Sequence, residues 1–293
     1  MPHELMSVIL QKLGVVEILN NAQKVCTYWR IVCKDPAMWK VINFPPDCLE
    51  LNDWDMLLNL YKQAVFRSSG ELIDIKLESL CNDDLLDFIS QRSSKLKCLS
   101  LSSCYAVTSS GLSHAAKRLP HLEQLHLFYT SIDAEDIEVI GTNCPQLKSF
   151  KLNKEFRRPH IECDGDALAI ANAMPELRHL QLFGNKMTNA GLEAILHGCP
   201  HLEFLDVRRC FNLDLGGSLG KLCMERIRFF MCPNDPTENC GFNPRAHAYD
   251  DFDDMYSSGN SDVDEFSGDD SYNDYEFSDG SVISEEDDYD YYD

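Results

Sequence analysis

Leucine and other apolar residues recur through the middle of the chain in a fixed frame, Leu-x-x-Leu-x-Leu. Clear copies begin at Leu96, Leu122, Leu147, Leu177 and Leu202, and weaker copies begin at Leu72 and Met224. The alternation within each copy predicts a short strand, and the interval of roughly 25 residues leaves room for one helix. Such a unit cannot bury its apolar side alone. We therefore expect an α/β solenoid of seven parallel strands with helices on the outer side.

The intervals between the copies also carry a repeated pattern. The residue ten positions before the first leucine is aliphatic in four repeats, at Leu86, Leu112, Ile137 and Leu192. The residue three positions before it is sulfur-containing in three repeats, at Cys144, Met174 and Cys199. These positions predict the buried side of each helix. Asp133, Asp164 and Thr188 are expected to cap helix N-termini, because their side chains accept hydrogen bonds from free backbone N–H groups.

Residues 1–45 have a different pattern. Leu5, Ile9 and Leu13 fall on one stripe of a helix, and a second stripe runs through Val25 and Trp29. So short a segment cannot bury these side chains by itself, so its apolar faces are expected to dock on another protein. Residues 46–70 follow, with apolar residues at helical spacing from Trp54 onwards, and predict a bridging helix that covers the first repeat.

The N-terminal blocks, in this order and spacing, resemble an F-box. That family implies a module of three helices that binds the SKP-type adaptor of a cullin ubiquitin ligase. The implied adaptor contacts are Pro2, Leu5, Ile9, Leu10, Leu13, Val25, Cys26, Trp29 and Trp39. Here the chain starts at Met1-Pro2, whereas F-boxes usually carry a few more residues before the leucine. The alternative interpretation is a generic helical cap on the repeats.

The Cys-Pro-x-Leu and Gly-Leu motifs of the repeats resemble those of plant F-box/leucine-rich-repeat proteins, and this resemblance covers residues 1–235. It implies a non-catalytic substrate receptor of an SCF-type (SKP–cullin–F-box) ubiquitin ligase. An unknown target protein would bind the strand residues that point away from the core, at the third, fifth and seventh positions of each frame. Aromatic and cationic residues gather there in the later repeats, as expected for an interface. The candidates are Phe128, Lys151, Phe183, Phe204, Arg208, Arg226, Arg228 and Phe230.

Two alternatives concern this candidate surface. The phenylalanines could instead pack on one another or under residues 231–249. One repeat is longer than the others, and its additional residues lie in the basic stretch 154–160. Insertions in repeat arrays map to loops on one face, so this stretch is either a second contact for the target or a solvated loop.

Charge separates the end of the chain from the rest. Eighteen of the 48 acidic residues fall in 250–293, which contains no lysine or arginine. We expect repeats over 71–235, a linker over 236–249 and a disordered acidic tail over 250–293. The tail disfavours nucleic-acid binding. It is either a solubilising segment or a competitor of the target for Arg208, Arg226 and Arg228. An acidic tail on leucine-rich repeats also resembles nuclear proteins that bind basic partners such as histones, and a scaffold outside any cullin complex is a third alternative.

The sequence offers no catalytic arrangement: it has no glycine-rich phosphate loop, no Gly-x-Ser-x-Gly elbow and no His-Glu-x-x-His. The thirteen cysteines contain no Cys-x-x-Cys pair, so we expect small buried residues in a reducing compartment, the cytoplasm or the nucleus. Zinc binding through Cys232 and Cys240 lacks the usual spacing. No stretch approaches the roughly 20 apolar residues of a membrane helix. Neither a cofactor nor a metal is expected.

Overall fold

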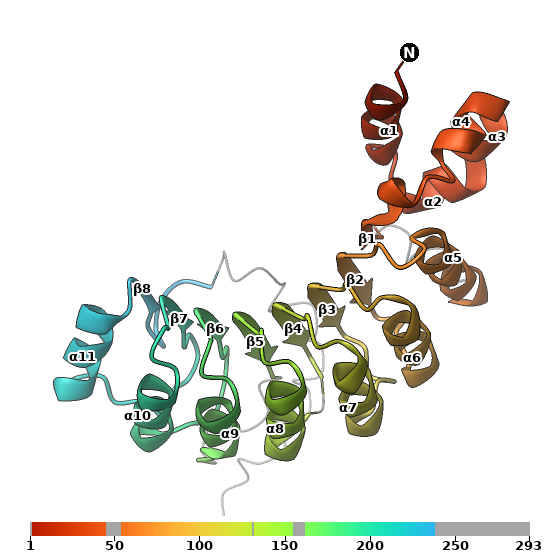
Figure 1. The fold of residues 1–293 in the computed structure, drawn as a ribbon. Helices are drawn as coiled ribbons and strands as arrows, with labels where there is room; N and C mark the ends of the chain where they lie inside the picture. The colour runs from red at the N-terminus through yellow and green to blue at the C-terminus, as the bar shows by residue number, and fades with distance from the viewer. Residues whose placement is uncertain (1, 45–53, 131, 155–161, 238–293) are drawn as a thin grey trace, which may run out of the picture. The chain divides into compact units, whose positions relative to one another are not determined.

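The computed structural model describes residues 2–44, 54–130, 132–154 and 162–237. The chain forms two units, 1–243 and 244–293, of which the described residues all belong to the first. Its centre is a parallel sheet of eight strands in sequential order (Figure 1). The strands are β1 (Val41–Asn43), β2 (Asp74–Glu78), β3 (Cys98–Ser102), β4 (Gln124–Phe128), β5 (Ser149–Asn153), β6 (His179–Gln181), β7 (Phe204–Asp206) and β8 (Phe229–Met231).

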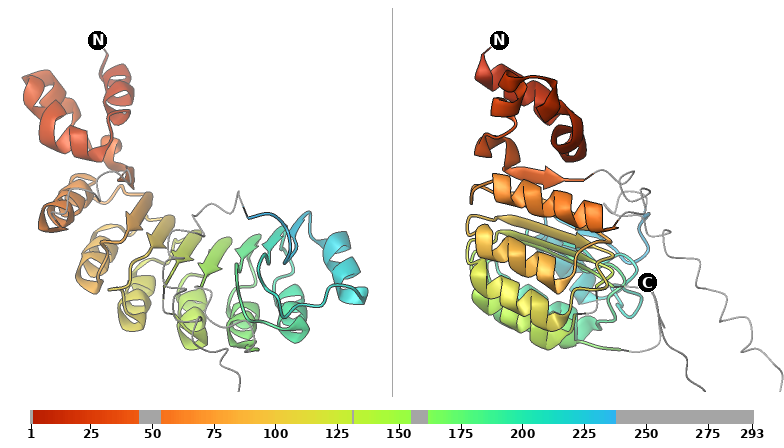
Figure 2. Two further views of the ribbon diagram at one scale, coloured as in Figure 1. Left: turned by 180° about the vertical axis from the view of Figure 1, so that it is seen from behind. Right: turned by 90° about the vertical axis from the view of Figure 1, so that its right-hand side faces the viewer.

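One helix follows each strand from β2 to β7, and all of these helices lie on the same side of the sheet (Figures 1 and 2). They are α6 (Asp83–Arg92), α7 (Ser109–Arg118), α8 (Ala134–Asn143), α9 (Gly165–Ala173), α10 (Asn189–Gly198) and α11 (Ser218–Arg226). The opposite side of the sheet carries no helix of the described chain, and we call it the open face.

The leucine frame explains the core. Its fourth position forms one register row across the sheet, and every member from β2 to β7 is at most 1% exposed. The row is Ile75, Leu99, Leu125, Phe150, Leu180 and Leu205. The helix positions predicted to be buried, Leu86, Leu112, Ile137 and Leu192, are buried too. The apolar side chains of each repeat therefore pack between its strand, its helix and the neighbouring repeats. This arrangement confirms the predicted solenoid.

The sheet differs from the prediction at both ends. It has eight strands rather than seven, because β1 lies within residues 1–45 and pairs with β2. The last repeat starts at Ile227 rather than Met224: Leu205 pairs with Phe230, so Phe230 takes the fourth position of the frame. Ile227 is buried whereas Met224 is exposed, which agrees with this register.

The N-terminal segment consists of short helices. These are α1 (His3–Gln11), α2 (Val15–Glu17), the π-helical turn η1 (Ile18–Ala22), α3 (Gln23–Val25), α4 (Thr27–Val32) and the 3₁₀ turn η2 (Pro36–Trp39). The run from Val15 to Val25 is continuously helical, so the segment contains three main helical stretches, as predicted. The bridging helix α5 (Trp54–Arg67) follows, and its Tyr61 ring stacks on Phe44 with ring centres 3.7 Å apart. Among the described residues no helix is long and apolar enough to span a membrane.

Carboxylates join neighbouring repeats. Asp83 accepts hydrogen bonds from the backbone N and the Oγ1 of Thr108, at 2.8 and 2.6 Å. Asp164 accepts the same pair from Thr188, at 2.7 and 2.8 Å. Asp164 therefore stands at the start of α9 without capping it, contrary to the prediction. Asp133 and Thr188 do cap α8 and α10 with their side chains.

Candidate interaction surfaces

The N-terminal helices expose an apolar surface. Leu5 is 58% exposed, Val25 63% and Ile31 63%, although large aliphatic side chains are normally among the most buried in a protein. Its members are Leu5, Val8, Ile9, Leu13, Val25 and Ile31, and we call them the N-terminal apolar surface. Pro2 and Cys26 are also exposed, and Trp29 is half-buried. Exposed apolar side chains concentrated in one segment are typical of protein-binding sites.

Leu10 and Trp39, two of the predicted adaptor contacts, lie in the core instead. Leu10 is fully buried, and Trp39 is 1% exposed with its Nε1 donating to the Cys33 carbonyl oxygen at 3.0 Å. They support the apolar surface from beneath and do not form it. Conversely, Val8 and Ile31 belong to the surface, although they are not among the adaptor contacts predicted from the sequence. Val8 follows Leu5 at helical spacing, which was a usable signal.

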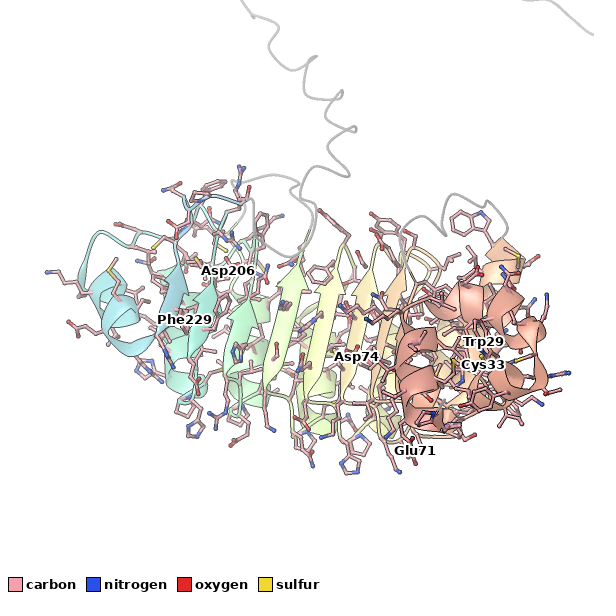
Figure 3. The ribbon with its side chains drawn as sticks, turned by 90° about the horizontal axis from the view of Figure 1, so that it is seen from above. Trp29, Cys33, Glu71, Asp74, Asp206 and Phe229 are labelled. Carbon is pink, nitrogen blue, oxygen red and sulfur yellow. The ribbon has the colours of Figure 1, made fainter. Side chains whose placement is uncertain are left out.

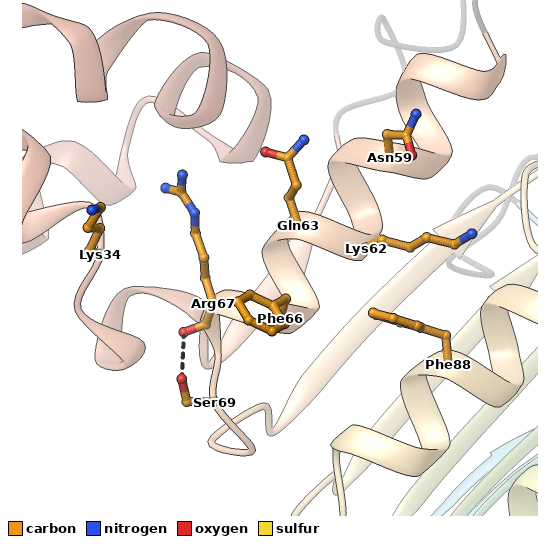
Figure 4. A pocket seen from close by; sticks show the side chains of 8 residues that line it. All are labelled: Lys34, Asn59, Lys62, Gln63, Phe66, Arg67, Ser69 and Phe88. Atoms are coloured by element: carbon orange, nitrogen blue, oxygen red, sulfur yellow. Dashed lines mark hydrogen bonds between the residues drawn. The ribbon is translucent and has the colours of Figure 1, made fainter.

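Arg67 joins the bridging helix to the N-terminal segment. Its Nη2 donates to Gln23 Oε1 at 2.7 Å, and its guanidinium lies 5.4 Å from the centre of the Trp39 ring. Burial lowers the pKa of Arg67, the interaction with Cys33 opposes this shift, and the charge of Arg30 adds to it. Beside Arg67 is a pocket of about 610 Å³ (Figure 4). It is lined by Lys34, Asn59, Lys62, Gln63, Phe66, Arg67, Ser69 and Phe88.

The open face carries only part of the predicted target site. Figure 3 looks onto this face and labels Asp74, Asp206 and Phe229 on it. Lys151 on β5 and Phe204 on β7 are half-buried on this face, as their frame positions predict. Phe128, Phe183 and Arg208 are buried, so the structure does not place them at a contact surface. Phe128 is 7% exposed and Phe183 1%.

Arg208 is buried because a carboxylate lies on the same strand. Its Nε and Nη2 donate to the two carboxylate oxygens of Asp206 at 2.9 and 2.7 Å, and its Nη1 donates to the Pro236 carbonyl oxygen at 2.7 Å. The guanidinium is thus held by its own chain, in the bidentate geometry of strong arginine–carboxylate pairs. Arg208 is therefore a structural residue of the seventh frame position and not a free cation for a target.

The changed register of the last repeat moves three further candidates. Arg226 is the last residue of α11, Arg228 precedes β8, and Phe230 turns its side chain towards the core. None occupies the open-face position predicted for it. The third, open-face position of this repeat belongs to Phe229, which pairs with Phe204 of the neighbouring strand and is 51% exposed. A 25-residue step from Leu202 leads to Ile227, so the repeat length itself could have revealed Phe229.

A row that contains two lysines and a histidine crosses the open face at the fifth frame position. Lys76 on β2, His126 on β4 and Lys151 on β5 share this row, with Ser100 of β3 between the first two. Burial, followed by the charges of Lys151 and Lys76, lowers the pKa of His126 to about 4. Burial also lowers the pKa of Lys151, the attraction of Asp206 opposes this, and the charge of Lys76 adds to it. Lys76 and Lys151 therefore repel each other, and their charges disfavour a proton on His126.

The cysteines match their prediction as small buried residues. Eight described cysteines are buried, whereas Cys26 and Cys163 are exposed and Cys232 is half-buried. Burial raises the pKa of Cys144 and of Cys199 to about 12, which leaves both thiols protonated. Among the described residues no group of His, Cys, Asp or Glu could hold a metal ion. Cys240, the basic stretch after Lys154 and the acidic tail lie outside the described residues.

Comparisons with known proteins match the N-terminal segment to F-box-like sequences and the repeats to leucine-rich repeats. A family model described as F-box-like matches residues 1–45. The leucine-rich repeats of FBD-associated F-box protein At5g56370 match residues 72–164, and a general leucine-rich repeat matches 174–196.

Three relatives come from Arabidopsis thaliana. F-box protein SKIP19 is 44% identical over 294 residues, covering 100% of this chain and 93% of its own. F-box/LRR-repeat protein 23 is 48% identical over 242 residues, covering 80% of this chain and 53% of its own. F-box protein FBW2 is 30% identical over 219 residues, covering 74% and 69%. The chain thus spans about half the length of F-box/LRR-repeat protein 23 and nearly all of SKIP19.

Proposed function

Because the chain belongs to the F-box/leucine-rich-repeat proteins, we propose that it is the substrate-recognition subunit of an SCF-type ubiquitin ligase. The N-terminal helices bind a SKP-type adaptor, and through it a cullin. The open face of the repeats binds the target protein. The protein acts in the cytoplasm or the nucleus, where its buried thiols stay reduced.

The N-terminal apolar surface carries this proposal. Leu5 and Ile9 project from α1 while their neighbours Met6 and Leu10 fill the core beneath, so the helix is held in place from inside and presents aliphatic area outside. Such area is stable in water only when a partner covers it for much of the time. A groove or helix pair with a complementary apolar face is the matching partner.

The subunit contributes proximity to the reaction. A bound target lysine is held near a ubiquitin carrier brought by the other subunits, which raises the effective concentration of the two reactants. This role needs two binding surfaces on one chain. It does not need a nucleophile or a general base in this subunit.

The double substitution Leu5→Ala/Ile9→Ala tests the proposal. Each change removes aliphatic area worth about 2 kcal/mol at roughly 0.8 kcal/mol per CH₂. Affinity for a purified SKP-type adaptor should therefore fall about a hundredfold or more, measured by isothermal titration calorimetry. The matched control is Leu168→Ala/Leu222→Ala, which removes two exposed leucines from α9 and α11.

The control variant should bind adaptor like the wild type. Equal binding by the Leu5→Ala/Ile9→Ala variant would contradict the assignment of the surface. Absence of adaptor binding by the wild-type chain would favour a scaffold that stays outside cullin complexes.

A further inference from the structure

The open face has two chemically different halves. Its fifth-position row presents the cations Lys76 and Lys151 on β2 and β5, with His126 of β4 between them, and we call these three residues the cationic row. Its third-position row presents rings on β6–β8: His179, Phe204 and Phe229, which we call the aromatic row. We propose that this face binds an extended segment of the target in which an anionic side chain lies about three or four residues from an aromatic or aliphatic one. This inference rests on the proposed function and specifies its substrate.

The two lysines of the cationic row are not held in ion pairs. Among the described residues, no carboxylate forms an ion pair with Lys76 or Lys151. Of the carboxylates near the row, Asp206 is held by Arg208, and Asp74 and Glu78 flank Lys76 at the third and seventh positions of β2, with Asp74 beside Cys98. An incoming carboxylate or phosphoryl group would therefore relieve repulsion and gain charge-assisted hydrogen bonds.

Small side chains leave room for that group. Cys98, Ser100 and Ser149 lie at open-face positions among the cationic residues, and His126 Nε2 is 3.3 Å from Ser149 Oγ. A ligand oxygen can thus approach the strand surface between Lys76 and Lys151 and meet hydroxyl and imidazole groups as well as ammonium groups.

The aromatic row supplies the second contact. The rings of His179 and Phe204 are stacked with centres 6.0 Å apart, and the Arg228 guanidinium lies 5.1 Å from the centre of the Phe229 ring. His179 and Phe229 are exposed, and Phe204 is half-buried. Rings fixed on strands contact a partner at a low cost in conformational entropy, and aromatic residues are enriched at interface centres.

The register of the sheet sets the spacing between the two contacts. Lys151 and Phe204 are two strands apart and differ by two positions along the strand. With about 4.8 Å between strands and about 3.3 Å per residue, their Cα atoms are about 12 Å apart. An extended peptide covers this distance in about three or four residues.

The test uses the full chain in complex with its adaptor and arrays of short synthetic peptides. Each array fixes glutamate, phosphoserine or glutamine at one position and randomises the others. The wild type should select glutamate or phosphoserine peptides with an aromatic or large aliphatic residue three or four positions away. The stronger of these two arrays identifies the anionic group as a carboxylate or a phosphoryl group.

Charge-neutral variants locate the contact. Lys76→Gln/Lys151→Gln should weaken binding of the selected anionic peptide about tenfold or more and leave its glutamine counterpart unaffected. Lys117→Gln/Lys221→Gln changes the net charge equally on exposed helix positions and should have little effect. Phe204→Ala/Phe229→Ala should remove the preference for an aromatic residue, and Phe66→Ala/Phe211→Ala, at exposed sites, should keep it.

Selection without an anionic preference would overturn the proposal, as would no selection at all. Equal binding by the wild type and the Lys76→Gln/Lys151→Gln variant would also overturn it. Adaptor capture by each variant, measured in parallel, shows that the chain is folded. Failure of adaptor capture by the wild type contradicts the proposed function alone, because the arrays can then be probed with the full chain by itself.

Discussion

Single carboxylates decide which residues are allowed at the start of two repeat helices. The Asp164 side chain reaches the first turn of α10, where it accepts two hydrogen bonds from Thr188. A Cβ atom on Gly191 would lie 2.4 Å from Asp164 Oδ1, and one on Gly111 would lie 2.0 Å from Asp83 Oδ1. Glycine therefore precedes leucine in these repeats because the carboxylate of the preceding repeat fills the space of a side chain.

This contact predicts the opposite of the usual helix preference. Alanine normally stabilises a helix interior by about 1 kcal/mol relative to glycine. Gly191→Ala should instead lower the free energy of unfolding by about 1–3 kcal/mol, because the new methyl group displaces Asp164. The measurement is urea denaturation followed by circular dichroism. The control is Gly217→Ala, since a Cβ at Gly217 meets nothing within 4 Å.

A second variant separates the clash from other causes. In the Asp164→Ala background the methyl group of Gly191→Ala has room, so the additional loss should largely disappear. A positive coupling in this double-mutant cycle supports the contact. Equal losses from Gly191→Ala in both backgrounds would show that Asp164 is not the obstacle.

At the scale of one strand, β4 gives the molecule a pH dependence. The pKa of His126 falls from 6.5 to about 4 on folding, so the unfolded chain binds a proton that the folded chain does not between these values. This contribution to stability is complete above about pH 6.5 and is lost as the pH falls towards 4. Between pH 7 and pH 5 the loss should be about 1–2 kcal/mol.

Comparison with His126→Gln isolates this effect. The variant should lose less stability than the wild type between pH 7 and pH 5, since both contain the same carboxylates. His121→Gln, at an exposed position, should follow the wild type. Parallel pH profiles for wild type and His126→Gln would mean that His126 titrates normally in the folded protein.

Elements with a regular period were predictable, and those defined by contacts were not. The buried row that contains Leu99 and Leu125 follows from the frame, because a buried parallel strand requires apolar side chains at fixed positions. Strand β1 has no such frame: Val41–Asn43 becomes a strand because it pairs with β2. The sequence pattern places the start of the last repeat at Met224, because Met224, Ile227 and Phe229 have the spacing of the leucine frame.

The residues of the interaction surfaces likewise divide into those that spacing predicts and those that depend on contacts. The helical stripe of Leu5 and Ile9 was readable from spacing, and both are exposed. Spacing alone could not assign Leu10 and Trp39 to the core, because the adaptor side and the core side are both apolar. The burial of Arg208 depends on its pairing with Asp206 and on the Pro236 carbonyl group, which no period encodes.

At the scale of the whole molecule, the pairing of β1 with β2 has a testable consequence. In a chain that begins at residue 46, the backbone groups of Asp74–Lys76 that face β1 lose their partner strand. Exposed strand edges pair with other chains. The shortened chain should therefore self-associate in sedimentation velocity experiments, whereas the full chain with Leu5→Ala/Ile9→Ala should not. A monomeric shortened chain would show that β1 is dispensable.

The same pairing limits how this protein can change over evolutionary time. A substrate receptor of the proposed kind acquires new targets by recombination when its repeats are exchanged and its N-terminal module is kept. Here the natural joint for such an exchange is occupied, because the last strand of the first module is also the first strand of the second. A crossover between them succeeds only if the incoming β2 matches the register of β1. For the proposed target site on the open face, point substitutions, which leave the backbone pairing unchanged, are the easier route to a new target.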